Sequence, residues 1–115
     1  LPHIDQMWVS RQIATQFHLQ KACKDSVLAS ATFHEPSLVF LAGTKTLLAG
    51  PDSAAQHIMA DPKCALAAVP AADAPAFLAA LSASGAKAEG SEPISGFNYS
   101  KGKEISITLY HIVQE

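Results

Sequence analysis

The sequence predicts an α/β domain with three layers, in which helices cover both faces of a mostly parallel sheet that ends in an antiparallel hairpin. Three observations support this class. Short apolar runs such as residues 27–31 have no helical stagger, which suits strands that are buried on both faces. These runs alternate with apolar helical stretches that are bounded by Pro and Gly. Near the end of the chain the apolar residues change to a period of two, as in a hairpin.

The size and charge of the chain limit the class of protein further. With 115 residues, the chain has the length of one domain that buries roughly two thirds of its unfolded surface. The net charge is −2 and the Lys and Arg residues do not cluster, which excludes the basic surface of a nucleic-acid-binding protein. No apolar run reaches about 18 residues, so we expect residues 1–115 to form a single soluble domain. Because the chain begins at Leu1 rather than at Met, we expect it to be a processed protein or a fragment of a longer one.

The first helix is expected to begin after Asp5, which is a suitable N-cap, and to end near residues 20–24. Lys21 and Lys24 suit the negative end of the helix dipole. One face of this helix carries apolar residues at spacings of three and four, and we expect them in the core: Trp8, Val9, Ile13, Ala14 and Phe17.

A strand, a polar turn and a second helix are expected next. The strand covers residues 27–31, and Pro36 favours a helix start because its missing N–H costs nothing there. The helix at residues 37–42 is apolar nearly all round, so we expect Phe40 in the core. Gly43 can adopt the left-handed conformation that ends a helix.

The remaining elements alternate in the same way. We expect a strand at 45–49, a helix capped by Asp52 or Ser53, a strand at 64–69, a helix from Asp73 to Gly85, a polar connector at 85–93, and a hairpin of strands 94–100 and 104–113. Short, right-handed crossovers favour a five-stranded sheet with the strand order 2-1-3-5-4, in which the fifth strand is antiparallel to its neighbours.

His34, Glu35 and Ser37 follow the first strand, at the edge where open α/β sheets bind ligands. A histidine, an acid and a hydroxyl are the residue types of acyl transfer, but Ser37 lacks the G-x-S-x-G context of a nucleophile elbow. Two interpretations remain open for these residues. They stabilise the turn and the first helical turn locally, or they contact a small anion or a sugar.

Asn98 and Tyr99 lie at the expected hairpin tip, beside Ser100 and Lys101. Ordinary hairpin chemistry explains Asn and Ser in this position. Tyr99 is a large side chain for a tip, so a contact of Asn98 and Tyr99 with a sugar or a neighbouring domain is the alternative.

We expect no metal site and no cofactor. None of the five histidines pairs with another, or with a cysteine, at the spacing of a zinc site: His3, His18, His34, His57 and His111. We expect His111 to be a partly buried or strand-end histidine. Gly90, Gly96 and Gly102 lack the strand-to-helix context of a phosphate loop, so we expect them in turns and bulges.

Two segments carry a family resemblance. The sequence HEPSLVFLAGT at 34–44, followed by GFNYSKGK at 96–103 and the ITLY strand, resembles the C-terminal domain of bacterial polytopic glycosyltransferases. These enzymes form the dolichyl-phosphate-mannose protein mannosyltransferase and aminoarabinose transferase superfamily. The Trp8-Val9-Ser10 segment also fits the part that precedes the first strand in that family.

The resemblance implies a function and a location. The chain would be an accessory domain, from the C-terminus of an integral membrane enzyme that moves a sugar from a polyprenyl-phosphate donor to an acceptor. It would lie on the periplasmic side of the bacterial inner membrane, in contact with the transmembrane portion of the same chain and with a sugar or lipid-linked acceptor. Family members carry their catalytic acid in loops between transmembrane helices, so we expect this domain itself to be non-catalytic. The alternative is a free-standing small α/β enzyme or ligand-binding protein that uses the turn at residues 34–37.

Cys23 and Cys64 lie just ahead of the first and third strands. If these strands are neighbours at about 4.8 Å, the two Cα atoms come within range of a disulfide. The oxidising compartment that the resemblance implies favours the bond. Two reduced cysteines that fill small gaps in the core are the alternative.

Overall fold

The computed structural model describes residues 4–33, 36–43, 46–98 and 103–113, and it confirms the α/β class. In chain order the elements are α1 (Ile4–Gln20), β1 (Leu28–Ala31), α2 (Pro36–Ala42), β2 (Leu47–Ala49), α3 (Pro51–Ala60), β3 (Leu66–Pro70), a 3-10 turn η1 (Ala71–Asp73), α4 (Ala74–Ala83), β4 (Ala88–Gly90), β5 (Ile94–Asn98) and β6 (Lys103–Ile112).

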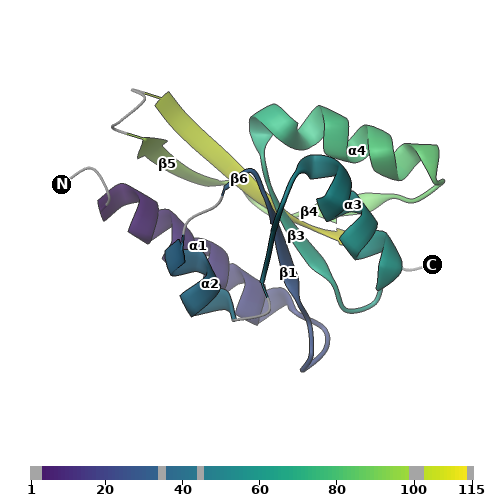
Figure 1. Ribbon diagram of the computed structural model, residues 1–115, viewed down its shortest axis with the longest axis horizontal. Coiled ribbons are helices and arrows are strands. Elements are labelled where there is room, and N and C mark those ends of the chain that lie inside the picture. Colours follow the sequence, from purple (N-terminus) through teal and green to yellow (C-terminus); the bar gives the residue numbers. More distant parts are fainter. Residues whose placement is uncertain (1–3, 34–35, 44–45, 99–102, 114–115) are drawn as a thin grey trace.

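The sheet lies between two pairs of helices, so the domain has three layers. Figure 1 shows α1 and α2 on one side of the sheet and α3 and α4 on the other. β1 explains why both faces are covered, because all four of its residues are buried. Leu28 joins the core beneath α1 and α2, whereas Ala29 and Ala31 join the core beneath α3 and α4. A strand that is apolar on both faces requires this double cover.

The predicted strand order is confirmed, and one strand is added to it. β1 pairs in parallel with β2 and β3, and β6 pairs antiparallel with β3. Ile107 in β6 lies opposite Pro70 of β3 and also opposite Ile94 of β5, so β3 and β5 occupy opposite edges of β6. The extra strand, β4, lies within the expected connector and pairs with the other end of β6. The backbone N–H of Ser91, between β4 and β5, donates to Leu109 O and holds this segment on the same edge of β6.

Helix α1 buries the predicted apolar face, with the exception of Trp8. Phe17 is only 2% exposed, which confirms its place in the core, but Trp8 is 47% exposed and its predicted burial is wrong. The buried stripe follows Val9, Ile13 and Phe17, with Ser10 on its other side. Trp8 lies one residue before this stripe, which rotates it by about 100° towards solvent. The side chain of Phe40 in α2 lies outside the described residues.

Two helix ends show how the backbone controls these elements. α2 ends at Ala42, and the next residue, Gly43, has a φ of 133°, which confirms the predicted left-handed end; its N–H donates to Val39 O. The predicted cap of α3 is wrong, because Gly50 occupies the N-cap position without a side-chain hydrogen bond and Pro51 begins the helix. Asp52 lies instead in the first turn, where a carboxylate favours the helix dipole.

We expect Gly90→Ala to lower the free energy of unfolding by about 1–3 kcal/mol, the usual cost of overpacking. A Cβ atom at Gly90 would lie 2.8 Å from Thr108 Cγ2 and 2.9 Å from Tyr110 Cε1. The Tyr110 ring is held in turn against Phe77, with 5.0 Å between the ring centroids. Urea unfolding measures the change. As a control, Gly50→Ala should cost less than about 1 kcal/mol because its Cβ would meet no atom within 4 Å. Equal losses in the two variants would contradict this explanation.

Candidate functional site

The carboxyl ends of β1 and β3 occupy the position of a ligand site in open α/β sheets. The two strands are parallel neighbours. The chain leaves β1 towards α2 and leaves β3 towards α4, and these helices cover opposite faces of the sheet (Figure 1). Sheets of this kind bind ligands outside the strand ends where the connections diverge in this way. The topology therefore favours the edge that the sequence predicted.

The turn after β1 is held firmly in an unusual conformation. Thr32 has a φ of 63°, which is rare for a β-branched residue. Its N–H donates to Ala49 O at 2.9 Å, and the N–H of Phe33 donates to Ala31 O at 2.6 Å. The buried Ser30 hydroxyl donates to Phe33 O at 2.6 Å. Backbone conformations of this kind persist where the surrounding contacts determine them, and they concentrate at functional sites.

The predicted contact residues lie at the border of the described chain. His34, Glu35 and Tyr99 lie outside the described residues. Ser37 is in the first turn of α2 and Asn98 is the last residue of β5, but their side chains also lie outside the description. The two interpretations of these five residues therefore both remain open.

The residues on either side of the two undescribed segments, 34–35 and 99–102, lie towards the same edge of the sheet. Ile107 is opposite Pro70, the last residue of β3, so the β6 residues before Ile107 extend past the carboxyl end of β3. Asn98 pairs with Lys103 at the far end of this extension. Figure 1 shows the β5–β6 hairpin projecting beyond the rest of the sheet. The hairpin thus extends from the same edge as the turn after β1.

Asp73 adds a carboxylate to this edge that the sequence suggested only as a helix cap. It follows β3 and occupies the N-cap position of α4, but its side chain makes no capping hydrogen bond. Asp73 is half-buried, so part of its surface is accessible. An acid three residues after a buried strand was the available signal, and a role at the start of the helix explained it without any function.

A disulfide joins Cys23 to Cys64 at the opposite edge of the sheet, which confirms the predicted pairing. The two Cα atoms are 5.3 Å apart, and the bond links the segments that lead into β1 and β3. It therefore closes a loop across a sequence separation of 41 residues.

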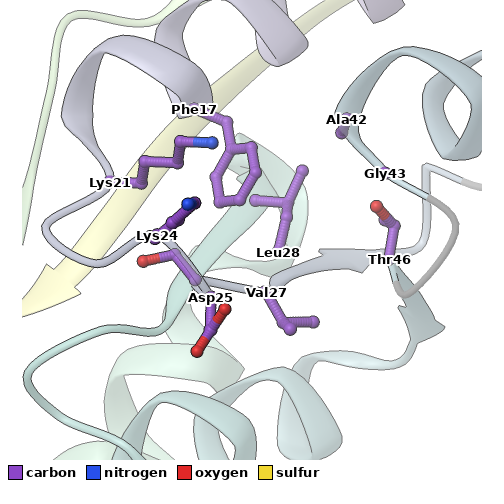
Figure 2. A pocket seen from close by; sticks show the side chains of 10 residues that line it. Phe17, Lys21, Lys24, Asp25, Val27, Leu28, Ala42, Gly43 and Thr46 are labelled. Atoms are coloured by element: carbon purple, nitrogen blue, oxygen red, sulfur yellow. The ribbon is translucent and has the colours of Figure 1, made fainter.

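Two cavities flank the disulfide. The α1–α2 cavity, of about 330 Å³, lies between the carboxyl ends of α1 and α2 and is lined by Phe17, Lys21, Lys24 and Thr46 among others (Figure 2). The second cavity, of about 340 Å³, lies beside Cys64 on the other side of the disulfide. Sequence reasoning did not find either cavity, because each is assembled from segments that are far apart in the chain.

His18, His57 and His111 each contact another group of the protein, and these contacts account for the positions of the three side chains without a bound metal ion. His57 Nε2 donates to Val27 O at 2.7 Å, and His18 Nε2 donates to Leu41 O at 3.0 Å. His111 lies near the end of β6, and its Nε2 is 3.7 Å from Glu89 Oε2. Its side chain is 46% exposed, in agreement with the expected partly buried, strand-end histidine. Across the described ranges, no three His, Cys, Asp or Glu residues are grouped so that they could hold a metal ion.

Comparison with protein-family models, with curated proteins and with solved structures yields no match for this chain. The family resemblance therefore depends on the residues named above, chiefly 34–44 and 96–110. None of the described helices has both the length and the apolar character needed to cross a membrane.

Proposed function

We propose that this chain is a non-catalytic accessory domain of an integral membrane glycosyltransferase, on the periplasmic side of the bacterial inner membrane. The parent enzyme would transfer a sugar from a polyprenyl-phosphate donor to an acceptor. The observation that carries the proposal is the Cys23–Cys64 disulfide, which adds to the family resemblance. Disulfides persist in the periplasm and are rare in the cytosol, so the bond is consistent with the location that the resemblance implies.

The exposed end of α1 supplies a surface for contact with the transmembrane portion. Met7 is 51% exposed and Trp8 is 47% exposed, although both are large apolar side chains. Trp and Met are enriched in protein interfaces, where burial of their large surfaces stabilises association. In this proposal Trp8 contacts the rest of the parent chain, and the turn at residues 34–37 and the β5–β6 hairpin face the acceptor.

The second candidate is a free-standing small α/β enzyme or ligand-binding protein that uses the turn at residues 34–37. The positive φ of Thr32 favours this second candidate, because Thr32 lies at the edge of the sheet where such folds bind ligands. The complete reading frame that encodes this chain distinguishes the two candidates. A reading frame that joins this chain to several apolar spans of about 20 residues supports the accessory domain. A frame that encodes only this domain after a signal peptide or an initiator Met would overturn it.

We expect the purified domain to transfer no sugar. Transfer from a phosphate-linked donor requires a poised base and a cationic clamp on the leaving phosphate. Residues 33–37, which would contact the acceptor, include no Lys or Arg, and Arg11, the single arginine of the chain, is exposed on α1. The assay supplies polyprenyl-phosphate sugar and acceptor to the domain and to the full-length parent. Turnover by the domain alone would contradict the proposal.

The same assay examines contacts in the parent. His34→Ala and Glu35→Ala should lower parental turnover if this turn positions the acceptor, while the parent remains folded. Trp8→Ala should lower turnover or the stability of the parent but leave the isolated domain unchanged, because Trp8 is exposed in the domain. Leu19→Ala, on an exposed position at the other end of α1, is a matched control and should affect neither.

A further inference from the structure

We propose that the α1–α2 cavity binds a small organic anion, namely a phosphate monoester or a carboxylate that is carried on a small apolar body. This site lies at the amino end of β1, on the opposite edge of the sheet from the carboxyl ends of β1 and β3. It is therefore separate from the proposed acceptor contacts, and the inference does not depend on the proposed function.

The dimensions of the cavity suit a small ligand. Its volume of about 330 Å³ is at the lower end of the range for small-molecule sites. The carboxyl ends of α1 and α2 and the segment that leads into β1 form the walls of this open cavity. His18 Nε2 donates to Leu41 O, so the two helix ends are tied to each other beside the cavity. A ligand would thus enter a site whose walls are already in place.

One wall of the cavity is positively charged. Lys21 and Lys24 both line the cavity there, and Figure 2 shows their ammonium groups on the same side of the cavity as the Phe17 ring. The Asp25 carboxylate points away from both ammonium groups in the same view. Neither lysine forms an ion pair with any residue that the structure describes. Lys21 Nζ lies 5.8 Å from the centroid of the Phe17 ring, and no described carboxylate neutralises either ammonium group, so their charge can attract a ligand.

The opposite wall offers a hydroxyl group. Thr46 Oγ1 is buried and has no hydrogen-bond partner within the described part of the chain. Figure 2 shows Thr46 across the cavity from the two lysines, with Leu28 between them. A buried hydroxyl without a partner is unfavourable, and a ligand oxygen can supply the partner once the Thr46 side chain rotates to present its hydroxyl to the cavity. The apolar floor of Phe17 and Leu28 suits the body of the ligand.

These donors select for an anion but not for one shape of anion. Each lysine ammonium group has three donor hydrogens and no acceptor, and hydrogen bonds between charged groups are stronger than neutral ones. Lysine acts as a point charge, so it accepts a phosphate as well as a carboxylate. A purely structural role, in which Lys21 and Lys24 only complement the carboxyl end of α1, is the competing explanation.

A titration followed by ¹H–¹⁵N NMR tests the site with phenyl phosphate and with benzoate. We expect saturable shifts at the amides of residues 21–28 and 46, with a dissociation constant of about 1 mM or lower for at least one probe. Phenol, which has the ring without the anion, should cause no saturable shift. Tighter binding of phenyl phosphate would assign the site to phosphate monoesters, and tighter binding of benzoate would assign it to carboxylates. Saturable binding of phenol, or of none of the three probes, would overturn the proposal.

Charge variants separate this site from diffuse attraction. Lys21→Gln/Lys24→Gln should weaken binding by about tenfold, because both charged hydrogen bonds are lost. The matched control is Lys63→Gln/Lys87→Gln, which removes the same charge at two exposed positions elsewhere and should leave binding within about twofold. Dispersion of the amide signals shows that each variant is folded. Equal weakening in the two double variants would overturn the proposal.

The variant Thr46→Val tests the role of the Thr46 hydroxyl, because it should raise the stability of the free protein and weaken ligand binding. It keeps the shape of the side chain but removes the buried hydroxyl. We expect the free protein to unfold at a higher temperature, because an unpaired buried group has been removed. We also expect binding of the preferred probe to weaken by about threefold to fivefold, because the ligand loses a hydrogen bond. Unchanged binding in this variant would remove Thr46 from the site and overturn the two-walled arrangement.

Discussion

Phe17→Ala is expected to lower the free energy of unfolding by about 3–5 kcal/mol, the usual cost of truncating a buried aromatic residue. Phe17 is 2% exposed and packs in the core that α1 and α2 form with the sheet. Its removal deletes apolar contacts and leaves a cavity that the surrounding strands fill only partly. The effect is a large fraction of the total stability of a domain of this size.

Urea unfolding of the isolated domain measures the effect, and α1 supplies a matched control. Trp8→Ala also truncates an aromatic residue of α1, but Trp8 is 47% exposed and should contribute less than about 1 kcal/mol. A similar loss in both variants would show that Trp8 is buried, as the sequence predicted, and would contradict the orientation of α1 described above.

Reduction of the Cys23–Cys64 disulfide is expected to lower the free energy of unfolding by about 4 kcal/mol. This magnitude follows from the chain-entropy model for the sequence separation of 41 residues, since the bond restricts the unfolded chain. The bond also fixes the segment after α1 to the segment before β3, next to both cavities. Urea unfolding with and without a thiol-free reductant measures the change.

The control for this experiment is the double variant Cys23→Ala/Cys64→Ala. It should have the lower stability of the reduced protein and should not respond to the reductant. Thiol titration of the denatured, unreduced native chain should detect no free thiol. Two free thiols per chain, or a native protein that is insensitive to the reductant, would contradict the role given to this bond.

Much of the sheet could be predicted because each element carries its own local signal. The apolar run that contains β1, the Pro at the start of α2 and the period of two in β6 are visible in the sequence. The disulfide followed from the strand order, because neighbouring parallel strands bring the residues before them together. β4 was missed because its three residues form a strand only by pairing with the edge of β6.

The candidate sites depended on different kinds of information. The edge at the carboxyl end of β1 could be predicted, because topology alone places it. Asp73 was assigned to helix capping, which is the commoner role of an acid in that position. The α1–α2 cavity could not be predicted, because Lys21 and Thr46 meet only after α1, β1 and α2 have packed together.

The sequence by itself predicted the α/β class, the order of the strands and a bond between Cys23 and Cys64, although it left two reduced cysteines as the alternative. The class follows from apolar periodicity and from Pro and Gly at the ends of elements, which are local signals, and the strand order and the cysteine pairing follow from general rules for connections between such elements. Only the tertiary structure decided that Trp8 is exposed and Phe17 buried, that Ala88–Gly90 forms a strand, and that two lysines face a threonine hydroxyl across a cavity. These outcomes depend on the angle at which each helix meets the sheet and on which strand edge is left open. Both are set by packing between elements that are distant in sequence, so local patterns cannot determine them.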